Sequence, residues 1–61
     1  MTRPEPLLVT KPEAARLLEI SERTLERLLR DGEIARVRVS RQLIRIPLAA
    51  LHQYVNSRRE S

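Results

Sequence analysis

The sequence lacks cysteine, tryptophan and phenylalanine, and its 61 residues include one glycine, one histidine and one tyrosine. Without cysteine there is no disulfide, and a structural zinc site is excluded because His52 alone does not supply four ligands. Proteins that bind single strands by base stacking use several aromatic side chains, whereas Tyr54 stands alone and is expected at the edge of the core. We therefore expect no metal and no other cofactor.

Long hydrophobic runs are also missing. No apolar stretch approaches the roughly 20 residues that cross a bilayer, and residues 1–6 lack the apolar segment of a secretory signal. A chain of this length has little room for a substrate pocket of a few hundred Å³, and His52 has no serine or cysteine close by to activate. These absences predict a cytoplasmic protein that is not an enzyme and that binds no small-molecule substrate and no membrane.

Basic residues outnumber acidic ones, 12 to 8, which gives a net charge of +4. All of the basic residues except Lys11 are arginines, whose planar guanidinium matches phosphates and guanine edges. This excess favours a polyanionic partner. A GC-rich genome also produces an arginine bias, so composition alone leaves both explanations open.

One domain is predicted. Residues 1–6 carry two of the four prolines and form a flexible N-terminal lead-in, residues 7–56 form the folded domain, and residues 57–61 form a polar tail. A chain of this size buries only about 60% of its unfolded surface. Self-association, or a ligand that binds only the folded state, is therefore expected to add stability.

Two short helices begin the domain. The segment Thr10-Lys11-Pro12-Glu13 predicts a capping box, in which Thr10 accepts from the Glu13 amide and the Glu13 carboxylate reaches back. A helix is expected from Lys11 to about Leu18, with its apolar side formed by Ala14, Ala15, Leu17 and Leu18. A second helix is expected between an N-cap at Ser21 and a C-cap glycine at Gly32, with a buried stripe of Leu25, Leu28 and Leu29. Ile20 fills the corner between them, and this arrangement is a helix-turn-helix unit.

After Gly32 the apolar residues no longer recur with the helical period of 3.6 but with the strand period of 2, which predicts a two-stranded hairpin. Its inward face is expected to be β-branched and its outward face arginine: Ala35, Val37 and Val39 alternate with Arg36 and Arg38, and Ile44 and Ile46 bracket Arg45. Pro47 ends the second strand, and a last helix over about 48–56 closes the core through Leu48, Leu51 and Val55. The predicted fold is α+β, a winged helix-turn-helix with a hairpin wing and a C-terminal helix.

The second helix carries the first candidate DNA-binding group. Arg23, Arg27 and Arg30 fall within an arc of about 60° opposite the leucine stripe. On an isolated helix they would form a solvated face with Glu–Arg pairs. The second helix of a helix-turn-helix enters the major groove with its N-terminal residues on base edges, which favours DNA recognition. Arg23 and Arg27 are then expected at bases or phosphates, and Arg30 at the backbone.

Two hydroxyls and one acid lie near the start of this helix. Ser21 has a structural role as the N-cap, and first-turn amides also attract phosphate, so it is a candidate for a second role. The Thr24 hydroxyl either reaches a phosphate or flanks the core, and both alternatives stay open. Glu22 opposes phosphate and is explained by the helix dipole.

The hairpin carries the second candidate group. Arg36, Arg38 and Arg45 are expected to share its outward face, with Arg41 and Gln42 at the tip. Such a wing lies along a phosphate ridge or inserts its tip into a minor groove. The alternative is that the charges protect an exposed sheet edge from aggregation. DNA contact is favoured because two separate elements present arginines.

The chain resembles the excisionase family of MerR-like winged helix-turn-helix proteins, small factors of phages, mycobacteriophages among them, and of other mobile elements. The resemblance covers about residues 7–55 and lies in four segments: LLVTKPEAARLL from Leu7, ISERTL from Ile20, GEI from Gly32 and RIP from Arg45. It implies a recognition helix that uses Arg23, Thr24 and Arg27, and a wing that uses Arg41 at a neighbouring minor groove or backbone.

The resemblance also implies a role. Excisionases bind repeated sites in an attachment region of double-stranded DNA, often cooperatively and with bending, and direct an integrase toward excision. Members of the same fold also serve as transcription regulators, and a protein-interaction module without a DNA role is a third hypothesis. The chain departs from the family where glycine is usual, at Glu19 and in Ser40-Arg41-Gln42, where the wing is one residue longer. Either Glu19 is left-handed, at about 1–2 kcal/mol, or the turn has another form.

Overall fold

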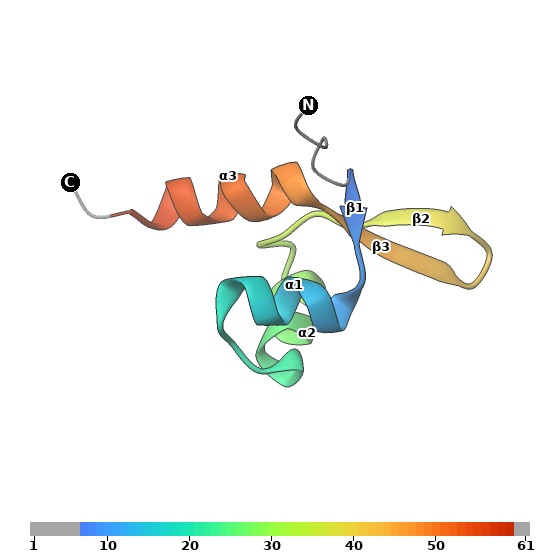
Figure 1. The fold of residues 1–61 in the computed structure, drawn as a ribbon, viewed down its shortest axis with the longest axis horizontal. Coiled ribbons are helices and arrows are strands. Elements are labelled where there is room, and N and C mark those ends of the chain that lie inside the picture. The colour runs from blue at the N-terminus through green and yellow to red at the C-terminus, as the bar shows by residue number, and fades with distance from the viewer. Residues whose placement is uncertain (1–6, 60–61) are drawn as a thin grey trace, which may run out of the picture.

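The computed structural model describes residues 7–59. Its elements follow in the order β1 (Leu8–Val9), α1 (Lys11–Leu18), α2 (Glu22–Arg30), β2 (Val37–Ser40), β3 (Leu43–Pro47) and α3 (Leu48–Arg58). In Figure 1, the β2–β3 hairpin projects to one side of the body and α3 to the other, while α1 and α2 lie together below them. The predicted α+β winged helix-turn-helix fold is confirmed. The lead-in expected over residues 1–6 and the end of the tail lie outside the described residues.

The sheet has three antiparallel strands, in the order β1-β3-β2, where the sequence predicted two. The additional strand, β1, pairs Leu8 with Pro47 and Val9 with Ile46. The Leu48 amide also donates to the Leu7 carbonyl, with an N–O distance of 3.0 Å. A strand of two residues is too short to show a period of two, and for this reason the sequence pattern did not reveal it.

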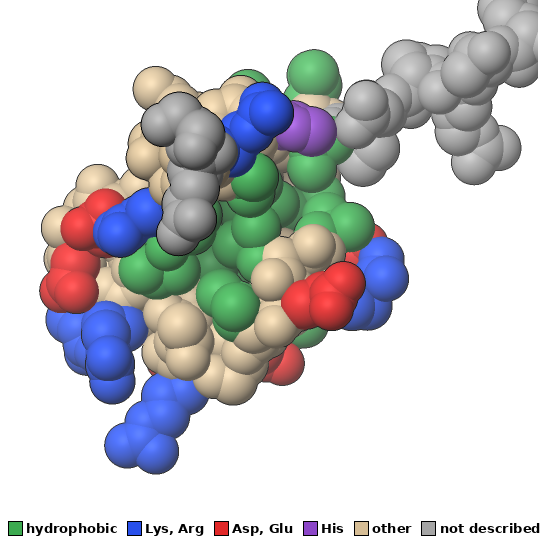
Figure 2. Space-filling view, turned by 90° about the vertical axis from the view of Figure 1, so that its left-hand side faces the viewer, with side chains coloured by type: hydrophobic (Ala, Val, Ile, Leu, Met, Phe, Trp, Pro, Cys, Tyr) green, Lys and Arg blue, Asp and Glu red, His purple; other side chains and the backbone are tan. Residues whose placement is uncertain are grey.

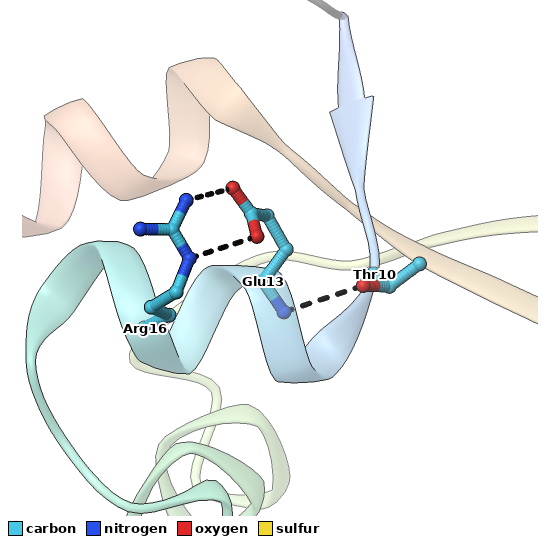
Figure 3. Close-up of polar contacts among 3 residues, drawn as sticks. All are labelled: Thr10, Glu13 and Arg16. Carbon is cyan, nitrogen blue, oxygen red and sulfur yellow. Dashed lines mark hydrogen bonds and ion pairs between the residues drawn. The ribbon is translucent and has the colours of Figure 1, made fainter.

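Half of the predicted capping box forms at the start of α1 (Figure 3). The Thr10 hydroxyl accepts from the Glu13 amide at 3.3 Å. The Glu13 carboxylate does not reach back to Thr10, because it accepts two hydrogen bonds from the Arg16 guanidinium instead. These hydrogen bonds and the opposite charge lower the pKa of Glu13 and raise the pKa of Arg16. Arg16 is therefore held by its own helix.

The turn between α1 and α2 keeps the left-handed geometry that usually takes glycine. Glu19 lies at φ 58° and ψ 42°. Its amide donates to the Arg16 carbonyl and the Ile20 amide to the Ala15 carbonyl, both at 3.0 Å. This pair of bonds is a Schellman motif, which satisfies the last carbonyls of α1 and turns the chain into α2. Of the two forms that the sequence left open for this turn, the structure has the one with a left-handed Glu19.

Replacing Glu19 with glycine is expected to stabilise the domain by about 0.5–1 kcal/mol. An L-residue in the left-handed region costs about 1–2 kcal/mol, and the greater freedom of glycine in the unfolded chain offsets part of the gain. The urea midpoint measures the effect. The matched control is Glu26→Gly within α2, which is expected to lose about 1 kcal/mol. A loss of stability in both variants would contradict the strain assigned to Glu19.

Helix α2 begins and ends where the sequence predicted, but its C-cap residue is Asp31 and not Gly32. The Ser21 hydroxyl caps the N-terminus by accepting from the Thr24 amide at 3.0 Å. Asp31 is the C-cap residue, and Gly32 follows it at φ 78°. The Gly32 and Glu33 amides donate to the carbonyls of the last turn in a second Schellman motif. Rigid ends fix the orientation of α2 relative to α1.

The core is small and lies between the helices and the base of the sheet. Leu25 of α2 and Ile46 of β3 are its largest fully buried side chains. The complete set of buried residues is Val9, Ala14, Ala15, Leu25, Leu29, Ile34, Ile46, Ala50 and Leu51. The prediction that Leu17 and Val55 belong to the core is wrong, because these side chains are 45% and 46% exposed. Both line an open pocket between α1 and α3 that no other described element covers.

Helix α3 continues two residues beyond its predicted end at Asn56. The Ser57 hydroxyl donates to the Tyr54 carbonyl at 2.8 Å. The Arg58 guanidinium lies 3.2 Å from the Glu33 carboxylate and 5.4 Å from the centre of the Tyr54 ring. These contacts stabilise the last turn. Among residues 7–59, no helix has the length and apolar character needed to cross a membrane.

Candidate nucleic-acid interface

The exposed side of α2 presents three guanidinium groups. Burial of Leu25 and Leu29 fixes the rotation of the helix, so Arg23, Arg27 and Arg30 are exposed on the opposite side. The ion pairs found within the described part of the chain are Arg16–Glu13 and Arg58–Glu33, and none involves α2. The Glu–Arg pairing that would explain these arginines as an ordinary solvated face is therefore absent from residues 7–59.

The start of α2 adds two exposed hydroxyls. The Ser21 hydroxyl donates to Thr24 Oγ1 at 2.9 Å, in addition to accepting from the Thr24 amide. This arrangement leaves the Thr24 hydroxyl proton free to donate outward. Thr24 is exposed and is not among the core residues, so it does not flank the core. Both hydroxyls lie beside the amide groups of the first turn, where anions are favoured.

The wing tip is a two-residue turn at Arg41 and Gln42, closed by pairing of Ser40 with Leu43. The additional residue expected in the wing is accommodated as a bulge, because the register shifts between Arg38 and Ser40. Among the described residues other than glycine, only Glu19 has a positive φ, so the tip needs no glycine. The Arg38 guanidinium also donates to the Arg41 carbonyl at 3.4 Å and supports the turn.

The wing arginines do not share one face, and this expectation is wrong. The register pairs Arg38 with Ile44, and Val37 with Arg45. Paired residues in antiparallel strands project to the same side and successive residues to opposite sides. Arg38 therefore projects with Ile44 and Arg45 projects from the other face. Arg36 precedes β2 and is exposed.

Arg45 differs from the other wing arginines in its surroundings. It is half-buried, and its guanidinium donates to the Ile44 carbonyl at 2.9 Å. Arg36, Arg38 and Arg41 are exposed. Alternation in the sequence assigned Arg36, Arg38 and Arg45 to one face and Arg41 to the tip, because the bulge at Val39 has no signal in the pattern. The structure therefore separates the half-buried Arg45 from three exposed wing arginines, of which Arg38 also donates to the Arg41 carbonyl.

The predicted β-branched inward face does not form, which corrects a second expectation. Val37, Val39 and Leu43 are exposed by 39%, 48% and 39%. The register places Val37 on the face opposite Ile44 and Ile46, and Val39 lies at the bulge. Only the base of the wing, at Ile46, lies in the core.

Taken together, α2 and the wing offer positive charge and hydrogen-bond donors, which are the groups that phosphates and guanine edges accept. In the described part of the chain, no three His, Cys, Asp or Glu side chains gather into a possible metal site. The chemistry of the surface is that of binding to a polyanion.

Comparison with known proteins agrees with this geometry. The profile of the family described as "Helix-turn-helix domain" matches residues 8–59, which include all three helices and all three strands. That family includes excisionase-like DNA-binding proteins. No curated protein and no solved structure matches the chain. The match spans most of the 61 residues, and the chain belongs to the helix-turn-helix domain family of DNA-binding proteins.

Proposed function

We propose that this domain binds specific sites on double-stranded DNA with α2 in the major groove and the wing on the adjacent backbone or minor groove. The observation that supports this most strongly is the group of three guanidinium groups on the exposed side of α2, none of which forms an ion pair within residues 7–59. An α-helix with its side chains is about 10–12 Å across, and the major groove is about 12 Å wide.

Position along α2 assigns a role to each residue. Arg23 lies in the first turn of α2 and Arg27 follows it by about one turn on the same exposed side, and we assign both to base edges. Arg30 is the last residue of the helix, and we assign it to the phosphates. Ser21 and Thr24 bind a phosphate through the first-turn amides and the free hydroxyl proton. The wing contributes Arg36, Arg38, Arg41, Gln42 and Arg45.

The register of the wing distinguishes Arg38 from Arg45 in this proposal. Arg38→Ala is expected to lower DNA affinity about 3- to 10-fold, the effect of losing one exposed phosphate contact. Arg45→Ala is expected to lower it by less than 3-fold, because Arg45 is half-buried and projects from the opposite face of the wing. Fluorescence anisotropy on one duplex measures both. Equal losses would show that the two faces contact DNA alike.

The biological role that we propose is that of an excisionase. The domain binds repeated sites in an attachment region, bends the DNA and directs an integrase toward excision. Sites spaced by whole helical turns place successive copies on one side of the duplex, so that small bends add in the same direction. Support for this role comes from the resemblance to MerR-like excisionases of phages, which extends over most of the domain.

A recombination assay tests the role. Purified protein is added to the integrase encoded by the same genetic element and to DNA carrying the recombined attachment sites. Stimulation of excision is expected, and Arg27→Ala is expected to remove it. Absence of stimulation, with DNA binding intact, would overturn the excisionase role and favour the alternative, a small transcription regulator that uses the same surface as a repressor or activator.

A further inference from the structure

An acid lies among the arginines of α2. Glu26 is exposed in the second turn of the helix, three residues after Arg23 and four residues before Arg30. With about 3.6 residues per turn, it lies about 60° from Arg23 and about 40° from Arg30 around the helix axis. Leu25, which faces the core, lies about 100° away. Glu26 therefore shares the exposed side of α2 with the arginines that we assign to DNA.

The usual local roles of a helical glutamate do not account for Glu26. Spacings of three and four residues bring acids and arginines together on a helix, yet no ion pair within residues 7–59 involves Glu26. The helix dipole favours an acid in the first turn, which is the position of Glu22. Glu26 lies beyond that turn, so neither effect explains an acid at this position.

The position of this acid matters because DNA is a polyanion. The net charge of the protein is +4, but Figure 2 shows a face on which acidic and basic side chains are interspersed around hydrophobic ones, so the surface is not uniformly positive. A carboxylate on the side of α2 that enters the groove repels phosphates and lowers affinity for DNA of any sequence. Its presence there is unfavourable unless it meets a hydrogen-bond donor on the DNA.

The donors that the major groove offers to a carboxylate are the amino groups of bases. Guanine presents only acceptors there, and thymine presents an acceptor and a methyl group, whereas cytosine presents its N4 amino group alone. Adenine presents its N6 amino group beside the N7 acceptor, a pair that suits an amide better than a carboxylate. The base edge that fits Glu26 is therefore that of cytosine.

We propose that Glu26 determines sequence preference by accepting a hydrogen bond from N4 of a cytosine beside a base contacted by Arg23 or Arg27. The inference rests on the proposed docking of α2 in the major groove, and it assigns a role to a residue whose charge alone would count against DNA binding. Arg23 and Arg30 are neighbours of Glu26 on the helix surface, with about 5–6 Å between Cβ atoms. Their positive charge offsets the repulsion between the carboxylate and the phosphates.

This role raises specificity mainly by weakening binding to other sequences. Arginines contact guanine edges but also any phosphate, so a surface of arginines alone binds random DNA well. At cytosine, the hydrogen bond to Glu26 compensates for the repulsion. At guanine or thymine, the carboxylate faces an acceptor and loses water without a replacement. The acid therefore lowers the affinity for random DNA more than the affinity for the specific site, and specificity is the ratio of the two.

Selection from a randomised duplex pool tests this role with wild type and Glu26→Gln. The exchange keeps the shape of the side chain, removes its charge and adds an amide, which pairs with N6 and N7 of adenine. Wild type is expected to prefer cytosine at one position by at least about 5-fold. Glu26→Gln is expected to prefer adenine at that position, to keep the preference elsewhere and to bind a random duplex about 2- to 5-fold more tightly. Glu26→Ala is expected to accept all four bases there.

The matched control is Glu22→Gln, which makes the same chemical change about one turn earlier. Glu22 is also exposed, but it lies about 100° from Arg23 and about 20° from Leu29, next to the leucine stripe. Glu22→Gln is expected to change affinity for every duplex by one common factor and to leave the preferred sequence unchanged. Circular dichroism is expected to show the helix content of wild type in each variant, because both glutamates are exposed.

Failure of this inference is distinguishable from failure of the proposed function. If wild type enriches a site and Glu26→Gln has the same preference at every position, the role of Glu26 alone is overturned. It is also overturned if the preference changes where wild type does not select cytosine, or if Glu22→Gln produces the same change. If wild type binds duplexes but enriches no sequence, or binds none, the proposed sequence-specific binding fails and the role of Glu26 fails with it.

Discussion

Replacing Arg27 with alanine is expected to lower affinity for the specific DNA site by about 1–3 kcal/mol, roughly 5- to 150-fold, and to relax sequence preference. Arg27 lies in the middle of the exposed side of α2, and no carboxylate of the described residues holds its guanidinium. A bidentate contact to a guanine edge is therefore available to it without breaking an existing pair. The site is first selected from a randomised duplex pool, and affinities are measured by anisotropy.

The control for this prediction removes the same charge elsewhere. Arg59 follows the last residue of α3 and belongs to neither α2 nor the wing, so Arg59→Ala is expected to change affinity by less than 3-fold. The ratio of specific to random binding decides the role of Arg27. Equal losses of affinity on both duplexes would make Arg27 a phosphate contact and contradict its assignment to bases.

Leu25→Ala is expected to destabilise the domain by about 2–5 kcal/mol. Leu25 is fully buried where α2 meets the rest of the core. The core of a domain this small supplies only about 3–5 kcal/mol, so the variant is expected to be largely unfolded at 25 °C. Circular dichroism and the urea midpoint measure the loss of helix and of stability.

The companion variant is Leu17→Ala, the same chemical change at a half-exposed position. It is expected to cost less than about 1 kcal/mol, because much of the side chain is already in water. Saturating duplex DNA is expected to restore helix to Leu25→Ala, since a ligand that binds the folded state stabilises it by mass action. A urea midpoint for Leu25→Ala equal to that of wild type would contradict the assigned core.

Local signals in the sequence were sufficient to predict the three helices, the hairpin and the order in which they follow one another. The caps at Thr10 and Ser21, the glycine at residue 32 and the leucine stripe of α2 each depend on a few neighbouring residues, and each lies where it was predicted. The group of arginines on α2 followed from the same periodicity. Local capping and burial patterns therefore position the main part of the candidate interface.

Features that depend on contacts between distant segments were not predictable from the sequence pattern. Strand β1 forms only because β3 offers it an edge, and the bulge at Val39 changes which residues face each other across the wing. Leu17 and Val55 have apolar side chains at positions that suit a core, but no element within residues 7–59 covers them. Tertiary context decides these positions.

The dependence of DNA affinity on salt tests the central claim most directly. Each phosphate neutralised by an arginine releases counterions and contributes about −0.9 to the slope of log K against log salt concentration. If five to seven arginines of α2 and the wing contact phosphates, a random duplex long enough for one copy is expected to give a slope of about −4.5 to −6. Arg30→Ala is expected to reduce its magnitude by about 1. A slope near zero would contradict DNA binding through this surface.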